Sequence, residues 1–234
     1  MTLKRISHFL QWLLAIVLPF VVLSFSNGNQ VVKAEKYNIE LKGDVAFVVE
    51  EDIVKTIDNL KDSSESINIR MLEERLSVMN GVIDAEVFSN LGKELSIVLQ
   101  QGTPIIRLFD SGRSYYLNEF GEQMALSPYY SARVPLVSGS LNSKIVEQIH
   151  PVFMHIRSDS LLSKLIDAAE VDENGQWILY SNLKGHEILL GEINQWEEKL
   201  EAFKAFYSHV VLTKKREDFK RLDLRFKSQV VLIN

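Results

Sequence analysis

Residues 6–25 form an uncharged and mostly apolar run near the start of the chain. A helix of about 20 such residues is long enough to cross the ~30 Å hydrocarbon core of a bilayer. Lys4 and Arg5 precede the run, and no other charge follows until Lys33. Basic flanks favour the cytoplasmic side. We therefore predict a short cytoplasmic tail at residues 1–5 and a transmembrane helix at residues 6–26 in the lipid bilayer. The rest of the chain is then expected to lie outside the cytoplasm.

A cleaved secretory signal is the alternative interpretation of this run. Such signals have an apolar stretch of about 7–15 residues followed by a small-x-small cleavage site. The run here is longer, and only Ser24-x-Ser26 resembles such a site. We expect a retained anchor, followed by a polar linker at residues 27–35.

Composition excludes several classes of protein. Charged residues make up 24% of the chain and the net charge is −5, so no basic surface supports nucleic-acid binding. The sequence contains no cysteine, which excludes disulfides, thiol catalysis and cysteine-bound metal.

In residues 36–104, some stretches have apolar residues spaced as in a β-strand and others have them spaced as in an α-helix. Strand-like alternation at 37–41 precedes a helical apolar spacing that starts after the acids at 50–52. Asn68 then stands where it can cap a second helix, and two further alternating runs follow at 83–87 and 95–99. The order strand, helix, helix, strand, strand predicts an α+β unit, with one sheet covered by two helices on one face.

Residues 105–234 predict a mainly antiparallel β domain with packed helices. A helix pair, or one helix broken around Pro151, is expected at residues 143–165. Asn194 is expected to cap an amphipathic helix that has Glu197 three residues on. The final runs, 222–226 and 230–233, predict two more strands.

No pattern in the sequence indicates catalysis. A glycine-rich phosphate loop, an H-E-x-x-H motif and a G-x-S-x-G elbow are all lacking. His150 and His155 are five residues apart, which does not place them on one helix face. We predict a protein that is not an enzyme, with no catalytic residues, no bound metal and no cofactor.

Several phrases resemble one family of proteins. The βααββ order after a single span is that of a POTRA domain, and residues 67–104 resemble its second half in the cell-division protein family FtsQ/DivIB. YLNEFG at residues 116–121, VPLVSG at 134–139 and LDLRF at 222–226 are similar to that family's motifs. Gln101 departs from the pattern, because the family usually has an acid near this position.

The resemblance implies a function as well as a fold. It implies a POTRA domain at residues 36–104 and an FtsQ-type β domain at residues 105–234. It also implies a non-catalytic scaffold of the bacterial divisome in the cytoplasmic (inner) membrane, concentrated at the division septum. The partners would be FtsB-like and FtsL-like proteins and, indirectly, the septal peptidoglycan synthesis enzymes.

The resemblance also implies a partner-binding site at the last strand. Arg225 would pair with a partner carboxylate, while Phe226 stands where the family has a tyrosine and lacks its hydroxyl. Ser228 would lie at the turn, and Val230 and Leu232 would line an added strand. Each has an ordinary alternative: Arg225 as an exposed base, and the two aliphatic residues as core-facing positions.

Two other functions remain open at this point. One is a secreted or anchored POTRA-type module of the cell envelope that binds polypeptides. The other is an envelope enzyme, for which the sequence offers no set of catalytic residues.

Overall fold

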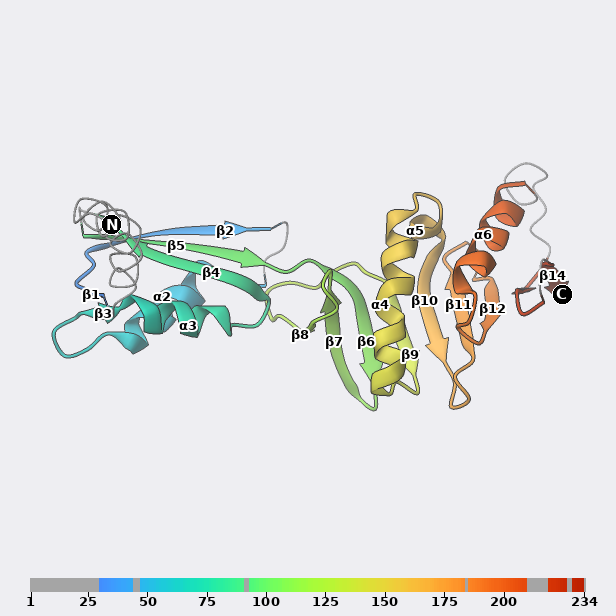
Figure 1. The fold of residues 1–234 in the computed structure, drawn as a ribbon, viewed down its shortest axis with the longest axis horizontal. Helices are drawn as coiled ribbons and strands as arrows, with labels where there is room; N and C mark the ends of the chain where they lie inside the picture. Colours follow the sequence, from blue (N-terminus) through green and yellow to red (C-terminus); the bar gives the residue numbers. More distant parts are fainter. Residues whose placement is uncertain are drawn as a thin grey trace, which may run out of the picture. The chain divides into compact units, whose positions relative to one another are not determined.

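The computed structural model describes residues 30–43, 47–90, 93–183, 185–209, 219–226 and 229–233. The chain divides into two units, drawn in Figure 1. The first contains the described residues up to Lys42 together with Val49–Gln100, and the second contains Gly43–Val48 together with Gln101–Asn234. The predicted tail and transmembrane helix, residues 1–5 and 6–26, lie outside the described residues.

The first unit is built on a three-stranded sheet in which β5 lies between β2 and β4. β2 runs parallel to β5, and a separate pair of short strands, β1 and β3, is antiparallel. The elements are, in chain order, β1 (Val31–Val32), β2 (Lys36–Lys42), α2 (Glu50–Leu60), β3 (Ile67–Asn68), α3 (Ile69–Ser77), β4 (Val82–Ser89) and β5 (Glu94–Gln101). The predicted order of strand, helix, helix, strand, strand is confirmed, with β3 between the helices. The strand β1 lies within the predicted linker.

Helices α2 and α3 cover one face of this sheet (Figure 1). Ile53 and Ile57 of α2 are fully buried, as are Leu72 and Leu76 of α3. Residues four apart share one side of a helix, so each helix packs a single apolar stripe. Asn68 begins α3 as predicted, because its Oδ1 accepts a hydrogen bond of 3.1 Å from the Met71 N–H.

The second unit contains a nine-stranded sheet with the order β14-β13-β12-β11-β10-β9-β6-β7-β8. Five neighbouring pairs are antiparallel and three are parallel, so the sheet is mixed but mostly antiparallel. Its elements are β6 (Pro104–Asp110), β7 (Arg113–Asn118), β8 (Gln123–Ala125), β9 (Leu136–Gly139), α4 (Ser143–Ser158), α5 (Leu162–Leu165), β10 (Ile166–Val171), β11 (Trp177–Ser181), β12 (Glu187–Gly191), α6 (Trp196–Phe206), β13 (Arg221–Asp223) and β14 (Val231–Ile233).

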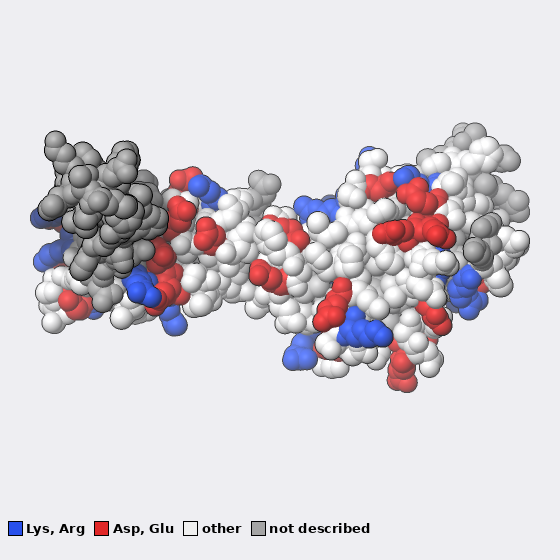
Figure 2. All heavy atoms as spheres, in the orientation of Figure 1, with Lys and Arg blue, Asp and Glu red and all other residues white. Residues whose placement is uncertain are grey.

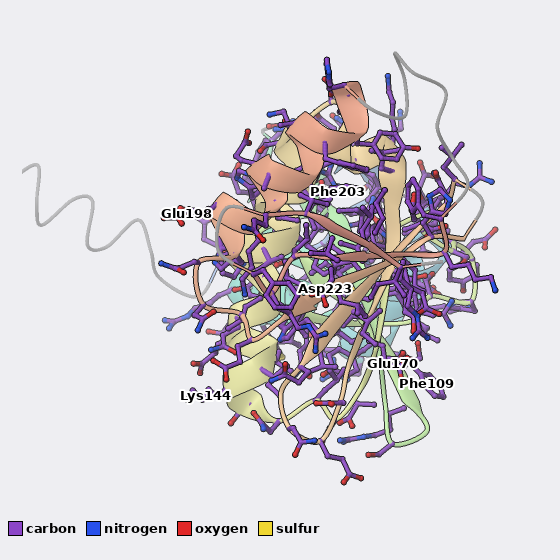
Figure 3. All side chains as sticks on the ribbon, turned by 90° about the vertical axis from the view of Figure 1, so that its right-hand side faces the viewer. Phe109, Lys144, Glu170, Glu198, Phe203 and Asp223 are labelled. Atoms are coloured by element: carbon purple, nitrogen blue, oxygen red, sulfur yellow. The ribbon has the colours of Figure 1, made fainter. Side chains whose placement is uncertain are left out.

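Helices provide the crossovers that two of the parallel pairs require. The chain passes from β9 through α4 and α5 to β10, and from β12 through α6 to β13. Helices α4 and α6 lie on the same face of the sheet (Figures 1 and 3). Phe153, Trp177 and Phe203 are buried in the core cluster of this unit, and Figure 3 shows Phe203 projecting from α6 toward the strands.

The other face of the large sheet carries no helix in the described part of the chain. Phe109 on β6 and Glu170 on β10 lie on this side (Figure 3), and Phe109 is 48% exposed. The Tyr180 hydroxyl donates to Glu170 at 2.8 Å, and burial, followed by this hydrogen bond, raises the pKa of Tyr180 to about 12. Antiparallel sheets commonly leave one face to solvent.

The segment Gly43–Val48 belongs to the second unit although its sequence neighbours belong to the first. Phe47 packs edge-on against Tyr116, with ring centroids 5.6 Å apart. The Gln101 side-chain oxygen accepts hydrogen bonds from the N–H groups of Phe47 and Val48 at 2.9 and 3.0 Å. Gln101 departs from the family pattern, but its side chain still supplies a buried oxygen that accepts hydrogen bonds.

Two local predictions concern helices of this unit. Residues 143–165 form a helix pair, α4 and α5, as one of the two expected alternatives had it. The other alternative, a break around Pro151, is wrong. Helix α4 runs through Pro151 to Ser158, because the loss of one helix hydrogen bond at a proline is offset by burial of Ile149 and Val152 on either side. The prediction for the second helix is also wrong. Asn194 does not cap α6. The capping position is Gln195, whose left-handed φ of 53° leaves no side-chain cap.

Candidate partner-docking site

The predicted site residues fall into two groups. Arg225 and Phe226 are exposed and lie just after β13, in the connection to β14. Val230 and Leu232 are partly buried and pack against the core cluster. Ser228 lies outside the described residues.

Arg225 is held by an acid two residues earlier. Its Nε donates to Asp223 Oδ1 at 2.9 Å, and its Nη2 donates to Asp223 Oδ2 at 2.6 Å. The Arg225 backbone N–H also donates to Asp223 Oδ1 at 3.0 Å. Side-chain hydrogen bonding by Arg225 is the main cause that lowers the pKa of the Asp223 carboxyl, so this buried acid stays ionised.

A glycine makes room for the arginine stem. Gly191, the last residue of β12, has φ +72°, and a Cβ placed there would lie 2.7 Å from Arg225 Cγ. Carbon atoms cannot approach this closely without a shift. Gly191 therefore lets the Arg225 side chain lie directly against the end of β12.

A cavity of about 360 Å³ lies beside this arginine. Its lining comes from the beginning of α6 and from the connection between β13 and β14, and includes Glu198, Lys199, Ala202, Arg225, Phe226 and Gln229. Charged, polar and apolar side chains thus meet around one hollow.

Lys199 fixes the loop between β12 and α6. Its Nζ donates to the carbonyl oxygens of Leu190 at 3.0 Å and Glu192 at 2.6 Å, and to Asn194 Oδ1 at 3.2 Å. Burial lowers its pKa. These bonds hold one wall of the cavity in place.

Strand β14 lies at the end of the large sheet and pairs with β13 alone among the described strands. Val231 and Ile233 are each 37% exposed. Their register partners are Asp223 and Arg221, on the face away from the helices. Sequence reasoning chose Leu232 from the same strand and Val230 just before it. Only the burial pattern separates these two residues from Val231 and Ile233.

Acidic and basic side chains both occur on the visible face of the described residues, and several acidic ones lie together in the upper right of the view (Figure 2). No cluster of three or more histidine or acidic residues suited to a metal ion occurs in the described ranges. Within the same ranges, no helix has both the length and the apolar character needed to span a bilayer.

Comparisons with known proteins place the chain in a family. No curated protein matches it. A solved structure of the major extracytoplasmic domain of the bacterial cell-division protein DivIB from Geobacillus stearothermophilus is similar, with 15% identity and a TM-score of 0.35, over 50% of this chain and 97% of that one. The family "FtsQ/DivIB, C-terminal related" matches residues 103–232, more than half of the 234 residues. This chain belongs to the FtsQ/DivIB, C-terminal related, family.

Proposed function

We propose that this protein is a non-catalytic, membrane-anchored scaffold of the bacterial division machinery. Its family supports a role in cell division. In this proposal residues 6–26 anchor the chain in the inner membrane, and the POTRA domain at 36–104 and the β domain at 105–234 lie outside the cytoplasm. The scaffold binds FtsB-like and FtsL-like partners and, through them, recruits septal peptidoglycan synthesis enzymes.

The position of β14 at the end of the sheet is the observation that carries partner docking. A terminal strand presents N–H and C=O groups along one edge, and another chain can pair with them as an added strand. The exposed side chains of Val231 and Ile233 add apolar contact area beside that edge.

Arg225 and Phe226 extend this surface beyond the strand. The guanidinium has N–H donors other than those bound to Asp223, so it can donate hydrogen bonds to a partner carboxylate while it stays in place. Phe226 is 53% exposed and lines the adjoining cavity, which gives a partner side chain an aromatic surface.

Anchoring contributes to this binding. Partners confined to the same membrane meet at an effective concentration far above that in solution. A scaffold with a short, exposed docking strand can then recruit its partners without a large interface.

Localisation in dividing cells tests the proposed function. A fluorescent fusion of the full chain is expected to gather at the division septum, and an even distribution around the membrane would contradict the proposal. A fluorescent protein that carries only residues 1–35 of this chain serves as the control.

Capture of an FtsB-like partner tests the site. Arg225→Glu is expected to reduce capture at least tenfold, because the new carboxylate repels a partner acid. Arg113→Glu, at a side chain that is 79% exposed at the start of β7, is the matched control and should leave capture unchanged. Equal capture by both variants would remove Arg225 from the site.

A further inference from the structure

The first unit has a long sheet edge of its own. β4 (Val82–Ser89) is eight residues long and lies at one end of the three-stranded sheet. Among the described strands, its only neighbour is β5. A strand of this length with a free edge is a template for pairing with another chain.

A carboxylate binds one N–H group of this strand. Glu73, on α3, is partly buried and accepts a hydrogen bond of 3.1 Å through Oε2 from the backbone N–H of Val87 in β4. Leu72 and Leu76 on the same helix are fully buried, so the helix that carries Glu73 is fixed against the sheet.

The Val87 N–H points away from β5. Three residues further on, the Asn90 N–H donates to the Glu94 carbonyl at the start of β5. Successive residues of a strand direct their N–H groups to alternate sides, so residues 87 and 90 face opposite ways. Val87 therefore offers its N–H at the free edge, and by the same alternation Ala85 does too.

The opposite edges of the two larger sheets are protected in other ways. β2 carries Lys36, Asn38, Glu40 and Lys42 as exposed side chains, and lysine on an edge strand discourages pairing. β8 has three residues, too few for a long ladder. β14 is also short, but it exposes the apolar side chains of Val231 and Ile233.

We propose that Glu73 closes the edge of β4 to strand addition. An incoming strand must pair with the outward N–H of Val87, and the Glu73 carboxylate already occupies that donor. Glu73 is then a specificity-determining residue that leaves β14 as the edge for a partner strand. This last step rests on the proposed function, whereas closure of β4 does not.

Hydrogen–deuterium exchange of the full chain in detergent tests the closure, with fragmentation that resolves the Val87 amide. Glu73→Ala is expected to speed exchange at Val87 at least tenfold. Glu73→Gln retains an acceptor oxygen and should keep most of the protection. Glu74→Ala, next to it on the exposed side of α3, should leave Val87 as in the unaltered chain. Unchanged exchange at Val87 in Glu73→Ala would overturn the proposal.

The probe for strand addition is a second copy of the same chain. Sedimentation velocity is expected to show that Glu73→Ala forms a larger species than the unaltered chain, and that Glu73→Gln does not. Adding Ala85→Pro to Glu73→Ala removes an outward donor and should reverse this association. A Glu73→Ala chain that loses protection at Val87 but sediments like the unaltered chain would overturn the guarding role. Neither readout measures partner docking at β14. A failure of that docking can therefore be distinguished from a failure of the proposal for β4.

Discussion

Arg225 and Asp223 are two residues apart, and their side chains form a paired contact of 2.9 and 2.6 Å at the end of β13. The acid is buried and the base is half exposed. A buried carboxylate left without a partner is costly, so this arginine has a structural role in addition to the docking role proposed for it.

Asp223→Asn tests that structural role. The change removes the charge from a paired hydrogen bond and is expected to lower the free energy of unfolding by about 1–3 kcal/mol. Asp110→Asn is the control, because its partner Arg113 is largely exposed and such pairs contribute about 0–1 kcal/mol. Urea unfolding measures both, and equal losses would contradict a special role for Asp223.

Asp159 makes the stability of the second unit depend on pH. Its Oδ1 accepts hydrogen bonds from the N–H groups of Leu161 and Leu162, and its Oδ2 lies 2.7 Å from Lys204 Nζ on α6. The hydrogen bond from Lys204, followed by the one from Leu162, lowers the pKa of Asp159 from 3.8 to about 2.

The folded pKa is below the ordinary value, so the unfolded chain takes up the proton first as the pH falls. The stabilisation is complete above about pH 5 and is lost as the pH falls toward about 2. The difference in unfolding free energy between the unaltered chain and Asp159→Asn should therefore be largest near neutral pH and shrink in acid. A difference that stays constant from pH 6 to pH 2 would refute this assignment.

Gly139 is expected to be intolerant of a side chain. Its φ is +112°, and an added Cβ would lie 2.0 Å from the Val171 carbonyl oxygen, where β9 meets β10. Gly112 has φ +83° with nothing within 4 Å of such a Cβ. An alanine there therefore measures the cost of the backbone conformation without a steric clash. Gly112→Ala should cost about 1–2 kcal/mol, and Gly139→Ala about 2 kcal/mol more. Thermal unfolding that shows equal losses would contradict the clash.

Gln101→Ala should destabilise the second unit. The change leaves the N–H groups of Phe47 and Val48 without the Gln101 oxygen, at an expected cost of about 1–3 kcal/mol. Gln101→Glu keeps two acceptor oxygens and should lose less. If urea unfolding shows that Gln101→Glu is less stable than Gln101→Ala, the side-chain oxygen does not determine stability at this position.

Local patterns predicted the elements that depend on local chemistry. The Asn68 cap follows from one side chain and its own helix, and strands β4 and β5 follow from the alternating runs at 83–87 and 95–99. The capping bond expected of Asn194 does not form. Its side-chain oxygen accepts from Lys199, which is held by the carbonyls of the preceding loop.

The site was only partly accessible to sequence reasoning. Arg225 and Phe226 were selected from a short motif, and both are exposed near a cavity. The burial of Val230 and Leu232 depends on which face of β14 meets the helices, and a run of four apolar residues at 230–233 does not contain that information. Glu73 meets Val87 only in the folded unit, so no spacing in the sequence indicates it.

The packing of Phe47 within the second unit has a consequence for the design of shorter fragments of this protein. The family match begins at residue 103, but Phe47 fills a space beside Tyr116 and Met124. A fragment that starts at residue 103 lacks Phe47 and leaves Tyr116 and Met124 without this contact. A fragment that keeps this packing therefore has to include Gly43–Val48 as well as the residues that the family matches.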